Sequence, residues 1–166
     1  MKQPLSADLP FAEGYVLPID KPLGWTSSDV VRKIKVMMRR LGHRKIKVGH
    51  AGTLDPLATG ILIVCLGRAT KQAEALQAQP KEYLTTLALG ATTPSFDMEH
   101  PVDRTFPYEH ITRQMLEEAL RTMEGEQMQL PPVYSAKSID GKRAYEYARQ
   151  GTEVEMRRAP VTVYGM

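Results

Sequence analysis

The sequence predicts an α+β (mixed α/β) fold on three observations. Residues 61–66 form an apolar run between two glycines, the pattern of a buried strand. Residues 26–42 carry apolar side chains at helical spacing. Elsewhere, strand-like and helix-like segments alternate irregularly, without the strict βαβ rhythm of a parallel sheet. We therefore expect a mixed sheet flanked by helices.

The composition is that of a globular domain with a core. The chain has 166 residues, of which 42% are hydrophobic and 25% charged, with a net charge of +3. No apolar run approaches the roughly 18 residues that span a membrane, and the first ten residues do not resemble a secretory signal. Cys65, the single cysteine, excludes an internal disulfide and fits a reducing compartment, so we expect the cytoplasm. Within its apolar run, Cys65 is interpreted as a buried apolar residue rather than a nucleophile.

The N-terminal part begins with residues 1–14, which show no periodicity and are expected to form a loose tail. Residues 15–20 predict a strand, placed at a sheet edge because Pro18 cannot donate a ladder hydrogen bond. A turn follows. Thr26 or Ser27 can then cap a helix that ends at Gly42 and turns one apolar face inward.

The other face of this helix, with the loop after it, carries charge of one sign. Between Val30 and Leu54 there is no acidic residue. Eight of the chain's 22 lysines and arginines lie there, and we call them the basic window: Arg32, Lys33, Lys35, Arg39, Arg40, Arg44, Lys45 and Lys47. A solvated helix face usually mixes both signs, so the pattern favours a polyanion such as nucleic acid.

The most informative stretch is residues 49–60, which hold three glycines, a proline, His50 and Asp55. Glycine and proline at this density predict a constrained loop. A loop that leads into a core strand can hold a reactive group on a rigid scaffold. Asp before Pro is also a common turn former, and the loop taken alone favours that structural interpretation.

The remaining elements are predicted from periodicity and from the glycine and proline residues that end each segment. Helices are predicted at residues 68–79, 112–123 and 142–149. Strands or extended segments are predicted at residues 81–89, 127–134, 152–156 and 160–164, with a polar loop at 91–107 and a turn at 138–141.

Most cofactor and hydrolase chemistries have no motif in the sequence. The four histidines show no metal-ligand spacing, and there is no phosphate-binding glycine loop or G-x-S-x-G elbow. An aspartic protease would need two D-[ST]-G-like sites, whereas Asp55 is followed by proline. A carboxylate beside a basic face remains, and it can act as nucleophile or general base without a cofactor. Chemistry on a nucleic-acid base would require that base to leave the stack.

Four ordered stretches resemble the TruB family of tRNA pseudouridine synthases. Residues 49–60, GHAGTLDPLATG, resemble its signature, and residues 21–31, KPLGWTSSDVV, its first motif. Residues 81–90 resemble its tyrosine motif. Residues 131–136 together with 141–149 resemble its RNA-gripping thumb.

The resemblance implies a pseudouridine synthase catalytic fold, with a mixed, mainly antiparallel sheet flanked by helices. Residues 15–166 would form the catalytic domain, and residues 126–151 its thumb insertion. The implied reaction isomerises uridine to pseudouridine at position 55 in the tRNA T-loop and needs no redox cofactor, ATP or metal. The implied partner is the T-arm and T-loop of tRNA, with no membrane, and a monomer is the default.

The resemblance also implies residue roles. Asp55 would be catalytic as the base is detached, rotated and rejoined through carbon 5; attack on the base, attack on the sugar and removal of a sugar proton all stay open. Tyr83 would stack on the target base, and His50 would contact the flipped-out nucleotides. Lys21 would shape the floor of the site. The thumb residues Lys142 and Arg143 would face the RNA.

Two expectations concern what surrounds this site. Family members carry a later K-G-T-Y-I-R-type motif, whose arginine pairs with the catalytic aspartate. Because this sequence lacks that motif, we expect an incomplete catalytic domain that is inactive or very weak alone. The alternative function is a non-catalytic RNA-binding or RNA-folding module on the same scaffold, which would tolerate Asp55→Asn. A nucleic-acid-binding hydrolase is a third, weaker option.

Overall fold

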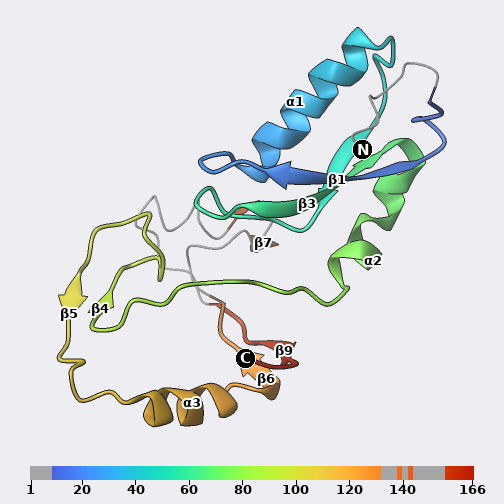
Figure 1. Ribbon diagram of the computed structural model, residues 1–166. Coiled ribbons are helices and arrows are strands. Elements are labelled where there is room, and N and C mark those ends of the chain that lie inside the picture. The colour runs from blue at the N-terminus through green and yellow to red at the C-terminus, as the bar shows by residue number, and fades with distance from the viewer. Residues whose placement is uncertain (1–8, 132–137, 140–141, 144–155) are drawn as a thin grey trace. The chain divides into compact units, whose positions relative to one another are not determined.

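The computed structural model describes residues 9–131, 138–139, 142–143 and 156–166 (Figure 1). The chain divides into two compact units, Met1–Leu84 and Thr85–Met166. Every strand pair among the described residues is antiparallel, and helices accompany the sheets. The predicted α+β class is confirmed. The strands are distributed over one three-stranded sheet and three two-stranded sheets in this part of the chain.

The first unit is built on a sheet of order β1-β3-β2, which consists of Tyr15–Lys21, Gly60–Leu66 and Val48–Ala51. The apolar run of β3 occupies the centre, as its composition requires, because a central strand is paired on both sides. β1 lies at the edge, where Pro18 costs no ladder hydrogen bond, so the predicted edge strand is confirmed.

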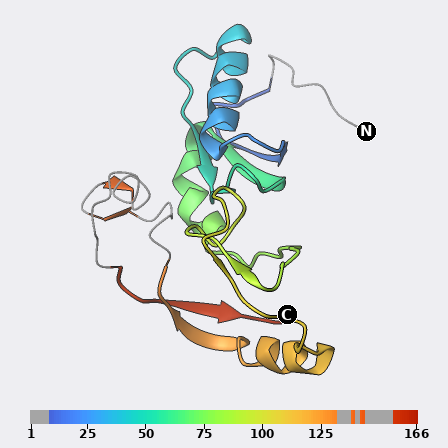
Figure 2. The same cartoon turned by 90° about the vertical axis from the view of Figure 1, so that its left-hand side faces the viewer.

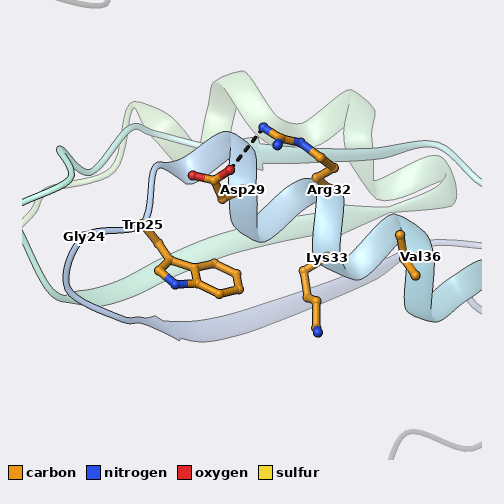
Figure 3. Close-up of a pocket in the computed structure, with 6 residues that line it drawn as sticks. All are labelled: Gly24, Trp25, Asp29, Arg32, Lys33 and Val36. Carbon is orange, nitrogen blue, oxygen red and sulfur yellow. Dashed lines mark ion pairs between the residues drawn. The ribbon is translucent and has the colours of Figure 1, made fainter.

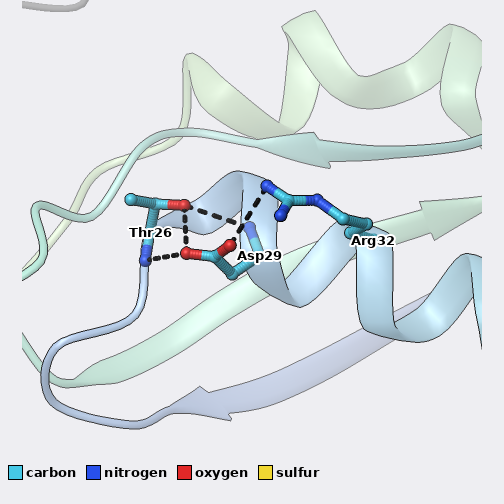
Figure 4. A network of polar contacts seen from close by, with 3 residues as sticks. All are labelled: Thr26, Asp29 and Arg32. Carbon is cyan, nitrogen blue, oxygen red and sulfur yellow. Dashed lines mark hydrogen bonds and ion pairs between the residues drawn. The ribbon is translucent and has the colours of Figure 1, made fainter.

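Helix α1, Ser27–Arg40, packs one face on this sheet (Figure 1). Val30, Ile34 and Met38 recur at helical spacing and join β3 side chains and Phe11 in the core. The helix begins with a capping box, in which the Thr26 hydroxyl accepts from the Asp29 amide and the Asp29 carboxylate accepts from the Thr26 amide (Figure 4). The predicted helix is confirmed.

The expectation of a loose tail over residues 1–14 fails at Phe11. Its side chain is fully buried and meets the rings of Tyr15 and His43 edge-on, with centroids 5.4 and 5.3 Å away. The backbone carbonyl of Ala12 accepts from the amide of Arg68. A single aromatic side chain therefore anchors the end of a segment that has no periodicity of its own.

The helix predicted at residues 68–79 is split. It forms a 3₁₀ segment η1, Gly67–Gln72, followed by a short helix α2, Ala73–Gln77. Only Ala69 of this stretch is fully packed. Neither segment has a side-chain N-cap, which limits the length of regular helix.

The strand predicted at residues 81–89 is wrong, since residues 81–88 have no regular structure. Leu84 and Leu87 are exposed, and among the described residues no neighbouring strand completes a ladder with this segment. Strand-like composition does not form a strand without a partner.

The second unit contains short elements. They are the pair β4, Ala91–Thr92, and β5, Arg104–Thr105; helix α3, Arg113–Arg121; the pair β6, Gly125–Gln129, and β9, Ala159–Val163; and the pair β7, Ser138–Ile139, and β8, Lys142–Arg143 (Figure 2). α3 is capped by Thr112, and β9 overlaps the strand predicted at residues 160–164 with a shift of one residue, so both predictions are confirmed. The pair β4–β5 lies inside the stretch expected to be a polar loop.

The segment that resembles the thumb is described only in part. Lys142 and Arg143 lie in β8, so the helix predicted at residues 142–149 does not begin there. Residues 144–149, and residues 152–155 of a predicted strand, lie outside the described residues. No helix in the described part of the chain is long and apolar enough to cross a membrane.

Candidate active site

Asp55 lies in the loop between β2 and β3, and the backbone on either side of it is tied to other elements. Before it, the Leu54 amide donates to Ser27 Oγ over 3.0 Å, and that hydroxyl donates to the Leu54 carbonyl over 3.1 Å. After it, the Pro56 carbonyl accepts from the Gly24 amide over 2.8 Å. The loop is thereby fixed on the start of α1 and on the turn before it.

The amine of Lys21 is a second tie beneath this loop. Its Nζ donates to the carbonyl oxygens of Trp25, Pro22 and Pro56 over 2.6, 3.2 and 3.4 Å. The side chain is fully buried. A buried ammonium requires such acceptors, and here they come from the turn before α1 and from the loop that holds Asp55. Lys21 therefore joins the turn before α1 to the Asp55 loop and does not present its charge to solvent.

The Asp55 side chain is exposed, and no described residue bonds to its carboxylate. Its backbone carbonyl accepts from the Ala58 amide over 3.0 Å, which closes the turn. A fixed backbone with a free carboxylate suits a group that must meet an external ligand.

His50 is half-buried at the end of β2, on the strand that leads into the same loop. Its Nδ1–H donates to the carbonyl of Gly52. This bond fixes the ring, leaving Nε2 as the other polar atom of the imidazole.

The other predicted site residues are not brought to Asp55 by a described contact. Tyr83 is 70% exposed, and no described residue makes a hydrogen bond or ring contact with it. For Lys142 and Arg143 the structure gives the strand β8 and its pairing with β7. Their side chains lie outside what is described.

The basic window provides the charge around this site. All eight of its cationic side chains are exposed, on α1 and on the loop that follows. Arg32 pairs with Asp29 at 3.1 Å, yet its side chain stays 72% exposed. An exposed field of one sign attracts a polyanion.

Two contributors to the site were not assigned roles there from the sequence. Ser27 was considered as a helix cap, but its hydroxyl instead holds Leu54. Gly24 was assigned to a turn, but its amide holds Pro56. Both contacts join segments about thirty residues apart, which periodicity does not detect.

Metal and thiol centres find no support among the described residues. In the described part of the chain, no three His, Cys, Asp or Glu residues lie together as a metal-binding group. Burial raises the pKa of the Cys65 thiol above its usual value, which disfavours the thiolate.

Comparison with known proteins identifies the family. The model of the TruB family pseudouridylate synthase, N terminal domain, matches residues 39–166. The chain belongs to this family.

TruB relatives match most of the chain. The tRNA pseudouridine synthase B of Phocaeicola vulgatus is 60% identical over 148 residues, which cover 89% of this chain and 63% of the relative. The protein of the same name from Flavobacterium johnsoniae is 47% identical over 93% of this chain and 68% of its own. The chain thus spans less than two thirds of the first relative's length.

A solved structure matches the TruB chain in fold. A chain in the crystal structure of a Cbf5-Nop10-Gar1 complex matches with a TM-score of 0.51 and 25% identity, over 83% of this chain and 34% of that one. This agrees with the predicted fold.

Proposed function

We propose that this protein isomerises uridine to pseudouridine in tRNA, at position 55 of the T-loop, with Asp55 as the catalytic residue. Family membership and relatives named tRNA pseudouridine synthase B support the reaction and the substrate class. The single structural observation that carries the assignment is the exposed Asp55 carboxylate, to which no described residue bonds, on a loop whose flanking residues are tied to Ser27, Gly24 and Lys21.

The reaction needs one bond broken and one formed at the same sugar carbon. The N1–C1′ bond breaks, the base rotates, C5 bonds to C1′, the C5 proton leaves, and N1 takes up a proton. No redox change occurs. A carboxylate held near the ribose and the base can serve this sequence as nucleophile or base. The target uridine must first leave the stacked T-loop. His50 lies on the strand that leads into the Asp55 loop, which favours it as a contact for the displaced nucleotides.

The test is tritium release from tRNA that carries [5-³H]uridine, using Asp55→Asn and Asp55→Ala in the intact protein. We expect release to fall to background while tRNA affinity stays the same or rises slightly, since one repelling charge is removed. Retained release in Asp55→Asn would instead establish a residue other than Asp55 as catalytic. Urea unfolding of both variants checks that the protein still folds.

T-loop specificity is tested separately. A T-arm hairpin RNA with uridine at the target position should release tritium, and the same hairpin with the label moved to a stem uridine should not. Release from both would contradict site selection in the loop.

A further inference from the structure

A pocket of about 460 Å³ lies on the outer side of α1, away from the core (Figure 3). It is lined by Gly24, Trp25, Asp29, Arg32, Lys33 and Val36. Positions 29, 32, 33 and 36 form one stripe along the helix because residues three and four apart share a face. The buried residues of α1 belong to the opposite face.

The pocket combines an open apolar surface with positive charge. The Trp25 side chain is 38% exposed and Val36 is 40% exposed. Lys33 is exposed, and no described residue forms an ion pair with it. The carboxylate of Asp29 is occupied by the cap and by Arg32. An aromatic plane beside a free cation suits a base that stacks and a phosphate that pairs.

This pocket adjoins the Asp55 loop through the backbone. The carbonyl of Trp25 and the carbonyl of Pro56 accept from the same Lys21 amine, over 2.6 and 3.4 Å. The amide of Gly24 donates to Pro56 over 2.8 Å. A strand of RNA held at Asp55 therefore has the pocket as a neighbouring surface.

We propose that this pocket is a subsite for an unpaired nucleotide of the RNA substrate, distinct from the uridine that reacts, with its base against Trp25 and its phosphate at Lys33. The inference rests on the proposed function, because RNA at Asp55 brings the nucleotide here. Charge complementarity favours RNA, because the pocket is lined by α1, which carries part of the basic window. After Asp29, no acidic residue offsets this charge until the Asp55 loop.

Trp25 is the only tryptophan in the 166-residue sequence, and the difference in emission between wild type and Trp25→Phe isolates its signal in the intact protein. The wild-type protein is titrated with unmodified tRNA transcript, and quenching by acrylamide is measured at each step. A stacked base should quench the emission and shield the indole, so the acrylamide quenching constant should fall as RNA saturates the protein. Saturating RNA binding with an unchanged quenching constant would overturn the proposal.

Variants separate stacking from charge. Trp25→Leu should weaken tRNA binding about tenfold, and Trp25→Phe should restore most of it, because the phenyl ring keeps a stacking face. Lys33→Gln should lower the slope of log K against log salt by about one unit, whereas Lys71→Gln, an exposed charge outside the pocket, should not. Equal affinities for wild type, Trp25→Leu and Trp25→Phe would refute the subsite.

Tritium release and tRNA binding together separate a failure of the subsite from a failure of the proposed function. If tritium is released normally but Trp25 stays accessible, the subsite is wrong and the proposed function stands. If the intact protein neither binds nor isomerises tRNA, both are wrong. Uridine 5′-monophosphate should protect Trp25 only weakly compared with tRNA, because the free nucleotide lacks the tether at Asp55. Protection as strong as that by tRNA would indicate a mononucleotide site instead.

Discussion

The side chain of Ser27 and the backbone of Leu54 exchange two hydrogen bonds across 27 residues of chain. Ser27 Oγ accepts from the Leu54 amide over 3.0 Å and donates to its carbonyl over 3.1 Å. Ser27 is 3% exposed, so water does not replace these bonds readily. The first turn of α1 thus fixes the residue directly before Asp55.

Ser27→Ala should lower the free energy of unfolding by about 1–3 kcal/mol, because both polar groups of Leu54 lose their partner. The matched control is Ser28→Ala, an exposed neighbour in the same helical turn, where alanine should be neutral or slightly stabilising. Urea unfolding measures both. Equal effects of the two substitutions would show that the Ser27 bonds contribute nothing to stability.

In the intact protein, Ser27→Ala should also reduce kcat more than it raises KM. A carboxylate displaced by about 1 Å can lose up to a hundredfold in rate without losing the substrate. Tritium release under single-turnover conditions gives the rate of the chemical step. A change in KM alone would mean that this tether affects binding and not the position of Asp55.

Lys21→Met should destabilise the fold by about 2–3 kcal/mol, since three carbonyl oxygens lose a charged donor. Lys35→Met is the control, because this lysine is exposed on α1 and its loss should stay within about 0.5 kcal/mol. A direct contact with RNA phosphate predicts the opposite result: unchanged stability and a weaker salt dependence of binding. The two measurements therefore decide whether Lys21 binds substrate or supports the loop.

The burial of Lys21 could have been predicted from the strand pattern. Tyr15, Leu17 and Ile19 point inward at period two, and Lys21 is the next position of that series. The resemblance to a first motif led instead to a role at the site floor. Burial and a role at the site are compatible, because an inward-pointing lysine at a strand end can reach the backbone carbonyls of Trp25 and Pro56.

Local patterns predicted the elements with internal periodicity. β3 and α1 carry their signals within a few residues, and both formed as expected. The burial of Phe11 and the absence of a strand at residues 81–88 depend on partners far along the chain. The loop of Asp55 was predicted, but its ties to Ser27 and Gly24 were not, since such contacts depend on the fold.

Gly67→Ala should be strongly destabilising. Gly67 has a φ of +58°, and a Cβ there would lie 2.3 Å from the Phe11 carbonyl oxygen and 2.5 Å from that of Ala12. The backbone conformation alone costs about 1–2 kcal/mol for alanine, and the clash adds to this by displacing Phe11 from the core. Thermal unfolding should show the loss directly.

Gly42→Ala isolates the conformational part of this cost. Gly42 has a φ of +91°, and nothing lies within 4 Å of an added Cβ. We expect Gly42→Ala to lower the free energy of unfolding only by the cost of the left-handed backbone. The difference in stability between the two variants therefore measures the clash. A Gly67→Ala variant no less stable than Gly42→Ala would contradict the close packing of residues 11 and 12.

The capping box of α1 should make stability depend on pH at the acid end. The pKa of Asp29 is lowered, first by the hydrogen bond from the Thr26 hydroxyl, then by the Thr26 amide, and also by Arg32 (Figure 4). Because the folded pKa lies below the unfolded value of about 3.9, the carboxylate stabilises the fold above that value. The contribution is lost as pH falls through the folded pKa.

Urea unfolding between pH 7 and pH 2.5 measures this loss. Asp29→Asn should be less stable than wild type at neutral pH, and the difference should shrink below about pH 4. Thr26→Ala should lose about 1 kcal/mol, the usual value of an N-cap, and should weaken the pH-dependent difference as well. Arg32→Gln should have a much smaller effect, since an exposed ion pair contributes little and is screened by salt. A pH-independent difference between wild type and Asp29→Asn would show that the charge of Asp29 contributes nothing to the capping box.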